Sequence, residues 1–399
     1  MSAHRSRRMD MVKPNAIGEL LKQGADPSLI SFAGGYPDAA SFPLHQLDAV
    51  FHAAIQQHGR QALQYTVSNG PLKFREQIAT RMQVRDIKCT AENILVLQGS
   101  QQGLDLTAKM LIDPGDVIVT ESPTFLGAMV AFNPCEPIYA GVRMDRDGMD
   151  MDHLEHVLKT TSNVKLIFTI PDFQNPTGVT LSAARRRRLI ELANEYDVVV
   201  LEDTAYRDLR FSGDAPPTLK SLDTQDRVIM LGSFSKTLAP GMRLGWAVAT
   251  GDMINDLGLL KLAADTQCST LNMMAASMFL ERYNLDDHIA LLRSVYVGKK
   301  NLMLDAIRRE FPQDVAFTDP DGGLFTWLTF LPGHDTAQFM LQHALPTAKV
   351  AYVPGASFFP VVHEHNHARF NYSGQSDEKI AEGIAALGRL LKQHAVRRM

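Results

Sequence analysis

Short apolar runs rich in β-branched residues alternate with amphipathic segments through the middle of the chain. The runs have the length of buried strands, and the segments between them have helical periodicity. We expect strands at 94–98, 117–120, 165–171, 197–203 and 227–234 and helices at 101–112, 151–159 and 182–196. This alternation predicts an α/β fold with a mostly parallel central sheet, whose binding sites lie at the carboxyl ends of the strands.

The pattern changes after about residue 290. We expect a helix at 293–311, strand-like segments at 315–330, 349–353 and 368–373, and a helix near 336–344. This order predicts a smaller α+β unit. The expected organisation is an N-terminal segment (1–43) that joins this smaller unit and includes a short helix near 14–24, a large domain (44–290) and a small C-terminal domain (291–399).

Composition excludes several classes of protein. The 399 residues carry a net charge of −4, from 40 Lys and Arg against 44 Asp and Glu, which argues against a nucleic-acid binder. No run approaches the roughly 18 apolar residues of a membrane span, and the basic start lacks the apolar stretch of a secretory signal. The three cysteines are far apart and form no CxxC pair, so we expect a cytoplasmic protein without a disulfide framework.

Polar residues gather where four of the expected strands end. In chain order they are Gly99, Ser100 and Gln101 after the first strand, Asn175 after the third, Asp203 and Tyr206 after the fourth, and Ser233, Ser235 and Lys236 after the fifth. Polar groups that converge at one edge of a parallel sheet predict a site there.

These residue types suit a phosphorylated aromatic aldehyde. The turn at Ser100 and Gln101 opens a helix whose free N–H groups bind an anion, and Ser233, Ser235 and Arg243 add donors for the same phosphate. Ser233, Ser235 and Arg243 all lie within the segment 233–243. Lys236 can form a Schiff base with a carbonyl if its pKa is lowered. Asp203 can keep a heteroaromatic nitrogen protonated, which makes the ring an electron sink.

Four motifs carry a resemblance to a known family. They are GSQQGLDL (99–106), FQNPTG (173–178), EDTAY (202–206) and SFSKTLAPGMRLGW (233–246). Together they resemble the class I/II aminotransferases, enzymes of fold type I that depend on pyridoxal 5'-phosphate (PLP). The chain is most similar to the 2-aminoadipate, kynurenine and broad-specificity aromatic and branched-chain aminotransferases. Segments 31–43, 63–79 and 368–373 extend the resemblance over nearly the whole chain.

The resemblance implies roles around the cofactor. Lys236 would be the Schiff-base lysine, Asp203 the partner of the pyridine nitrogen, and Asn175 and Tyr206 the partners of the phenolic oxygen. Phe125 would stack on the ring, at a position where relatives often have Tyr. Ser100, Gln101, Ser233, Ser235 and Arg243 would surround the phosphate.

The resemblance also implies substrate contacts and a partner subunit. Arg369 would bind the substrate α-carboxylate in bidentate fashion, and Gly34 and Gly35 would let the N-terminal segment close over the substrate. Tyr65 would reach the phosphate of a neighbouring subunit, so we expect a homodimer. The implied reaction is ping-pong transfer of an amino group from an L-amino acid to a 2-oxo acid such as 2-oxoglutarate or pyruvate.

The substrate class is less constrained. Relatives commonly have an arginine near the start where this chain has Gly18, which favours apolar, aromatic or branched-chain donors. A 2-aminoadipate aminotransferase and a PLP-dependent lyase or decarboxylase remain alternatives. A regulator's effector domain is disfavoured because only about thirty residues precede AGGYPD, too few for a winged-helix domain.

Two charged clusters favour ordinary structural roles. His363, His365 and His367 have a spacing that could hold a metal, but a polar surface turn is the favoured interpretation, so we expect no metal site. The run from Arg185 to Arg188 is expected to form a solvated helix face.

Overall fold

The computed structural model describes residues 5–12 and 26–396. The helix expected near 14–24, and Gly18 within it, lie outside the described residues. Within the described ranges, no helix is both long enough and apolar enough to cross a membrane. Short helical turns lie at Arg7–Asp10, Ala39–Ser41, Ala91–Asn93, Asn133–Cys135, Pro240–Met242 and Gly355–Phe358.

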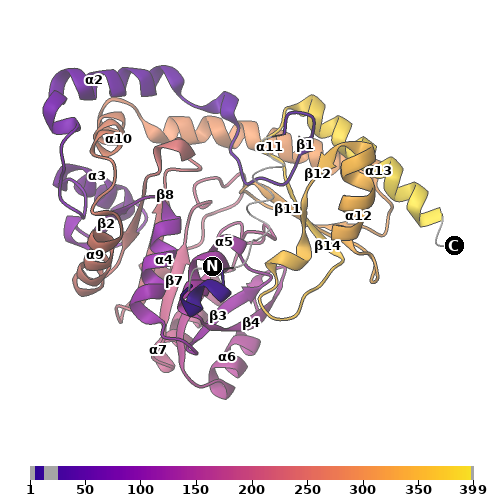
Figure 1. Cartoon of the computed structure of the whole chain (residues 1–399), viewed down its shortest axis with the longest axis horizontal. Helices are drawn as coiled ribbons and strands as arrows, with labels where there is room; N and C mark the ends of the chain where they lie inside the picture. The colour runs from indigo at the N-terminus through magenta and orange to yellow at the C-terminus, as the bar shows by residue number, and fades with distance from the viewer. Residues whose placement is uncertain (1–4, 13–25, 397–399) are drawn as a thin grey trace.

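The larger sheet has eight strands (Figure 1). In spatial order they are β2 (Ile94–Leu97), β9 (Gly245–Val248), β8 (Val228–Ser233), β7 (Val199–Asp203), β6 (Val164–Thr169), β3 (Val117–Ser122), β4 (Ile138–Asp145) and β5 (Gly148–Met149). Only β9 and β5 run against the others. This arrangement confirms the mostly parallel α/β sheet, and the carboxyl ends of β2, β6, β7 and β8 share one edge.

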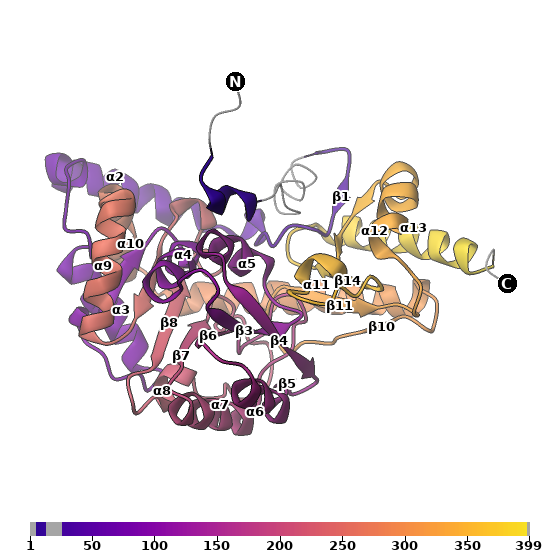
Figure 2. The ribbon, with the colours of Figure 1, turned by 60° about the horizontal axis from the view of Figure 1, so that its bottom comes forward.

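Helices cover both faces of this sheet, as Figure 2 shows. One face packs on α4 (Ser100–Leu111) and α5 (Leu126–Phe132), and the other on α6 (Met151–Thr160), α7 (Ala183–Glu195) and α8 (Leu219–Leu222). Ser182 caps α7 by accepting a hydrogen bond from the Arg185 amide at 3.4 Å. Near β2 and β9 the remaining helices are α2 (Leu44–Ala62), α3 (Leu72–Gln83), α9 (Gly251–Asp265) and α10 (Thr270–Arg282).

A smaller antiparallel sheet lies towards the C-terminal end. Its strands, in spatial order, are β10 (Ala316–Phe317), β11 (Phe325–Thr329), β14 (His367–Asn371) and β13 (Val353–Pro354). Helices α12 (Thr336–Phe339), η6 (Met340–Ala348) and α13 (Asp377–Val396) accompany it. Strand β1 (Ile30–Ser31) pairs in parallel with β12 (Val350–Ala351), so the N-terminal segment joins the C-terminal end of the chain.

Helix α11 (Leu285–Glu310) connects the two sheets (Figure 1). Leu292 and Tyr296 pack in the core of the larger sheet, whereas Met303 and Ile307 pack in the core of the smaller one. The helix begins eight residues before the expected start at residue 293. It therefore runs through residue 290, where the boundary between the large and the small domain was expected. It therefore holds the two sheets at a fixed spacing, and the cavity described below lies where they meet.

Three strands of the larger sheet were missed by the sequence analysis: β4, β9 and the two-residue β5. Strand β4 lies towards the sheet edge and is mostly half-exposed, so its residues lack the continuous apolar pattern of the central strands. Strand β9 has only four residues, Gly245–Val248, and directly follows the turn at Arg243. All three strands are recognisable only from their pairing partners.

Candidate active site

The expected strand-end residues come together around one cavity of about 760 Å³. Strand β7 ends on Asp203, β8 ends on Ser233 just before Lys236, and α4 begins on Ser100 directly after β2. The sequence-predicted residues that line the cavity are Gly34, Gly35, Ser100, Gln101, Phe125, Asn175, Asp203, Tyr206, Ser233, Ser235, Lys236, Arg243 and Arg369. Tyr65 does not line it, and 79% of its surface is exposed.

One end of the cavity gathers hydrogen-bond donors that can bind an anion. Gly99 has a φ of 74°, and a Cβ there would lie 2.7 Å from Arg243 Nη2. The positive φ therefore favours glycine, and a Cβ there would push the Arg243 guanidinium out of its position. Arg243 Nη2 donates to the Gln98 carbonyl at 3.1 Å, and Ser233 Oγ accepts from the Ser235 amide at 3.1 Å. These donors surround the first turn of α4, whose free N–H groups favour an anion.

Lys236 and Asp203 lie deeper in the cavity, and burial perturbs both. Burial, together with the positive charges of Arg369 and Arg243, lowers the pKa of Lys236 to about 8. Burial raises the pKa of Asp203 to about 6. Lys236 Nζ donates to the Gly35 carbonyl at 2.6 Å, and Asp203 Oδ1 accepts from the Ala205 amide at 3.0 Å. A lysine with a lowered pKa suits a nucleophilic amine.

A hydrogen-bonded row links the two sheets across the cavity. Asn175 Nδ2 donates to the Tyr206 hydroxyl at 3.2 Å, and Arg369 Nη1 donates to Asn175 Oδ1 at 2.7 Å. Arg369 Nη2 donates to the Ala33 carbonyl at 2.6 Å. Burial raises the pKa of Tyr206 to about 12, so the phenol stays protonated at neutral pH.

Two aromatic rings enclose the guanidinium of Arg369. Its central carbon lies 4.2 Å from the ring centroid of Phe325 and 5.1 Å from that of Phe358. Burial lowers the pKa of Arg369 to about 10, which leaves it charged at neutral pH. Its Nε is buried and has no hydrogen-bond partner among the described residues. A buried guanidinium with an unused donor is suited to a carboxylate ligand.

The cavity also contains residues that the sequence analysis did not single out. They are Ala33, Tyr36, Pro37, Leu126, Gly127, Val130, Ile170, Ala205, Pro240 and Phe358. The ring of Phe125 lies over Gly127, where a Cβ would be 2.4 Å from the ring. Gly127 and Tyr36 could have been named as cavity residues from the sequence, because they stand close to Phe125 and Gly35, respectively. No local signal marks Phe358, because only packing brings it to Arg369.

The two charged clusters have different outcomes. Arg186 is fully buried and bonded to Asp172, so the prediction that the whole run from Arg185 to Arg188 is solvated was wrong. His363 and His365 are exposed, but His367 is buried at the start of β14, so the prediction of a polar surface turn was wrong for His367. The Nδ1 atoms of His363 and His367 contact Ala356 O and Thr329 Oγ1, respectively. Across residues 5–12 and 26–396, no group of three His, Cys, Asp or Glu side chains is placed to hold a metal ion.

Comparisons with known proteins agree with this geometry. The family model for aminotransferase class I and II matches residues 30–387. The chain is 40% identical over 387 residues to the aromatic-amino-acid aminotransferase 1 of Thermococcus litoralis, covering 96% of this chain and 92% of that protein.

Two solved structures are similar over 98% of both chains. The multiple substrate aminotransferase of Thermococcus profundus superposes with a TM-score of 0.93 at 36% identity. LysN, the α-aminoadipate aminotransferase of Thermus thermophilus, complexed with N-(5'-phosphopyridoxyl)-L-leucine, superposes with a TM-score of 0.91 at 34% identity. The chain therefore belongs to the class I and II aminotransferases, a family of PLP-dependent enzymes that transfer amino groups.

Proposed function

We propose that the amino donor of this aminotransferase is an L-amino acid with an aromatic, branched-chain or other apolar side chain, and that the acceptor is a 2-oxo acid such as 2-oxoglutarate or pyruvate. The observation that carries this proposal is the composition of the cavity wall. Among the described residues, only Asp203, Lys236, Arg243 and Arg369 contribute charge to it. Each has a partner in the cofactor or the α-carboxylate, which leaves an apolar wall for the substrate side chain.

The residues present fit PLP. The anion-binding end matches the phosphate, and buried Asp203 matches a protonated ring nitrogen. The unused Nε of Arg369 marks a place for a second anion, the substrate carboxylate. When bound, PLP supplies an electron-withdrawing ring that makes the α-proton of an amino acid acidic.

Each cavity residue has a proposed role in holding the cofactor. Lys236 binds it covalently, Asp203 pairs with the ring nitrogen, and Asn175 and Tyr206 donate to the phenolic oxygen. Phe125 stacks on the ring and offers no hydroxyl. Ser100, Gln101, Ser233, Ser235 and Arg243 donate to the phosphate. The support for these roles is that all these side chains line one cavity.

The chain's own residues then act on the substrate. Arg369 would fix the α-carboxylate by its planar guanidinium. The amine of Lys236, released from the cofactor when the amino acid replaces it, would take the proton from the substrate Cα and deliver it to the cofactor carbon that the lysine had held. The pKa of Lys236, lowered to about 8, leaves enough neutral amine for this task near neutral pH. Gly34 and Gly35 line the cavity beside Tyr36 and let the N-terminal segment cover the substrate.

A homodimer in the cytoplasm completes the proposal. Leu63, Tyr65 and Val67 are 72%, 79% and 58% exposed, an apolar surface that a second copy would cover. Tyr65 would then reach the phosphate bound by the partner subunit. All three cysteines are free, which suits a reducing compartment. Light scattering of the holoenzyme tests the dimer, and a monomeric active enzyme would contradict it.

A panel of amino acids tests the donor preference. The purified holoenzyme is mixed with leucine, phenylalanine, methionine and 2-aminoadipate, and the single-turnover rate is followed through the cofactor's absorbance. The apolar donors should have higher kcat/KM values than 2-aminoadipate. If 2-aminoadipate is preferred, the substrate assignment is wrong and the 2-aminoadipate alternative replaces it.

The same panel separates transfer from a lyase or decarboxylase. With an amino acid alone, an aminotransferase releases one equivalent of 2-oxo acid per site and then stops until an acceptor is added. A lyase or decarboxylase instead releases ammonia or carbon dioxide continuously. Parallel lines in double-reciprocal plots with two substrates would support the ping-pong order.

A further inference from the structure

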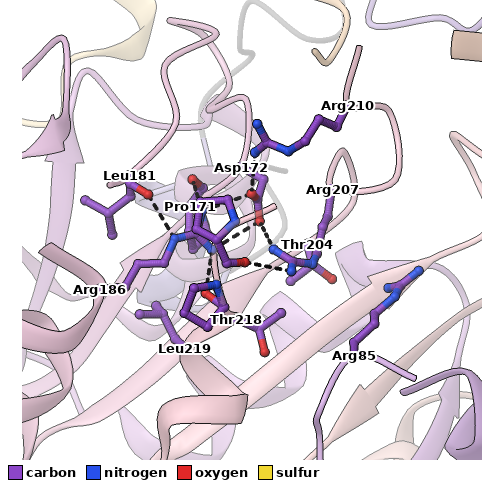
Figure 3. Close-up of polar contacts among 12 residues, drawn as sticks. Arg85, Pro171, Asp172, Leu181, Arg186, Thr204, Arg207, Arg210, Thr218 and Leu219 are labelled. Atoms are coloured by element: carbon purple, nitrogen blue, oxygen red, sulfur yellow. Dashed lines mark hydrogen bonds and ion pairs between the residues drawn. The ribbon is translucent and has the colours of Figure 1, made fainter. Parts of the chain in front are cut away.

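A buried carboxylate outside the cavity joins the two loops that carry Asn175 and Tyr206. Asp172 is 1% exposed and faces three arginines, as Figure 3 shows. Arg186 Nη2 donates to Asp172 Oδ1 at 2.9 Å and Arg207 Nη1 donates to Oδ2 at 3.0 Å. Arg210 Nη2 donates to Oδ1 at 3.3 Å. None of these four residues lines the cavity.

The positions of these residues in the chain show which two segments the cluster connects. Asp172 stands three residues before Asn175, and Arg207 directly follows Tyr206. The ion pair between Asp172 and Arg207 therefore ties the loop after β6 to the segment after β7. Arg207 Nη2 also donates to the Pro216 carbonyl at 2.7 Å, which fixes the guanidinium from its other side.

Arg186 fastens the loop after β6 at both of its ends. Its Nη2 donates to the Pro171 carbonyl at 2.8 Å, and its Nε donates to the Leu181 carbonyl at 2.9 Å. Arg186 is fully buried on α7, a rigid helix that packs on the sheet. The loop that carries Asn175 is therefore held by a helix that makes no contribution to the cavity wall.

The charge of Asp172 is essential to this arrangement. Burial alone would raise its pKa, but Arg186 and Arg207 outweigh burial and hold the pKa below its usual value. A carboxylate surrounded by three guanidinium groups stays ionised and accepts charge-assisted hydrogen bonds, which are short and directional. Without that charge, three buried cations would face one another.

We propose that Asp172 is a positioning residue that, through Arg186 and Arg207, sets the spacing between Asn175 Nδ2 and the Tyr206 hydroxyl. This inference rests on the proposed function, in which both groups donate to the phenolic oxygen of PLP. Correct spacing lets both donors reach that oxygen at once. Loss of the Asp172 charge lets the two loops separate, and the phenolic oxygen then loses part of its stabilisation as an anion.

The loop has a second anchor that remains when Asp172 is changed. Gln174 Nε2 donates to Glu121 Oε2 at 3.0 Å and to the Pro123 carbonyl at 2.9 Å, and Gln174 Oε1 accepts from the Thr177 amide at 2.9 Å. We therefore expect Asp172→Asn to keep the fold while loosening one side of the loop. Arg207→Lys is a milder second variant, because Asp172 keeps its bonds to Arg186 and Arg210.

The control variant is Asp223→Asn. Asp223 is also a buried carboxylate, with its side chain 1% exposed and paired with Lys220. It accepts from the Val228 amide at 3.0 Å, at the start of β8 and hence at the sheet edge away from the cavity. It reports what the loss of a buried carboxylate does to stability alone.

The experiment compares the resting holoenzymes by the pH midpoint at which the absorbance of the bound cofactor changes. In Asp172→Asn and Arg207→Lys, we expect this midpoint to rise by about one pH unit, because a weakened hydrogen bond stabilises the ionised phenolic oxygen less. The kcat should fall roughly tenfold, as expected for a perturbed electrostatic contact. Asp223→Asn should change neither quantity, although it lowers the unfolding temperature of the apoprotein.

An unchanged midpoint and kcat in both Asp172→Asn and Arg207→Lys would overturn the inference and leave a purely structural cluster. If Asp172→Asn does not fold, Arg207→Lys alone decides by the same two measurements. Failure of the proposed function would be distinguishable, because the unchanged enzyme would then prefer 2-aminoadipate in the donor panel, or show no amino transfer to a 2-oxo acid, before any variant is made.

Discussion

Arg369 and Asn175 are 194 positions apart in the sequence, yet Arg369 Nη1 donates to Asn175 Oδ1 at 2.7 Å. Arg369 lies in β14 of the smaller sheet, and Asn175 lies in the loop after β6 of the larger one. The bond crosses the cavity and joins the group proposed to bind the substrate carboxylate to a group proposed to bind the cofactor. With these proposed roles, this one hydrogen bond would couple the positions of substrate and cofactor.

Replacing Lys236 by alanine should abolish both turnover and the visible absorbance of the bound cofactor. Lys236 is the cavity's only lysine among the described lining residues, so no neighbouring amine can replace it. Spectra of the purified protein with added PLP, together with the amino-transfer assay, measure the effect. Lys109→Ala, which removes a surface ion pair with Asp105, is the control. A Lys236→Ala protein that retains absorbance and turnover would refute the assignment.

Asp203→Asn should stabilise the apoprotein while removing activity. The pKa of Asp203 is raised from 3.8 to about 6 in the folded chain. The folded state therefore binds the Asp203 proton more tightly than the unfolded state does. The contribution of this protonation to the free energy of unfolding is complete below pH 3.8 and is lost as the pH rises through 6. At pH 8, Asp203→Asn should raise the free energy of unfolding by up to about 3 kcal/mol.

Denaturation of the apoprotein at pH 8 and pH 4 checks this prediction, since the gain should vanish at the lower pH. The holoenzyme activity should fall roughly a hundredfold or more, because the ring nitrogen loses its anionic partner. Asp214→Asn, at an exposed loop position, is the control. If Asp203→Asn gains no stability over the unchanged protein at pH 8, burial of Asp203 carries no charge penalty.

Arg369→Lys should raise the KM of every amino-acid donor roughly ten- to a hundredfold, because an ammonium cannot replace a planar fork worth about 1.5–3 kcal/mol. The guanidinium also lies between Phe325 and Phe358, a geometry that an ammonium does not fill. Steady-state kinetics with several donors measure the effect. Arg185→Lys, at a bidentate pair with Asp145 away from the cavity, should leave KM unchanged. An unaltered KM in Arg369→Lys would mean that another residue binds the carboxylate.

Gly99→Ala should weaken cofactor binding at least tenfold. The new methyl group would lie 2.7 Å from Arg243 Nη2 and would displace the guanidinium from the anion-binding end. Gly115→Ala is a matched control, because its φ of 94° imposes a similar backbone strain while no atom lies within 4 Å. Titration of PLP into both apoproteins gives the dissociation constants. Equal affinities of the Gly99→Ala and Gly115→Ala proteins would contradict the prediction that the methyl group at residue 99 disturbs the anion-binding end.

Much of the fold and of the site could be predicted from local patterns. The central strands are continuous apolar runs because both of their faces are covered, and the observed β2, β3, β6, β7 and β8 match the predicted runs within two residues. Asp203, Ser233 and Lys236 could be placed because a strand end is recognisable from the residues next to it. Their catalytic roles and the domain boundaries stay predictions.

Other features could not be predicted locally, because they depend on distant segments. The periodicity of α7 did not reveal that Arg186 is buried, since the partner that makes burial possible, Asp172, comes from another element. Phe358 reaches the cavity only because the smaller sheet packs against the larger one. Strand β4 shows little periodicity because it lies near a sheet edge.

The sequence by itself determined the five central parallel strands, the helices α4, α6 and α7 between them and the chemical groups at the strand ends, because hydrophobic periodicity and turn residues act over a few positions. The tertiary structure alone decided which side chains meet: Arg369 with Asn175, Lys236 with the Gly35 carbonyl, and Asp172 with three arginines. These contacts join residues far apart in the chain. Their geometry follows from packing two sheets against one helix, which a local pattern does not contain.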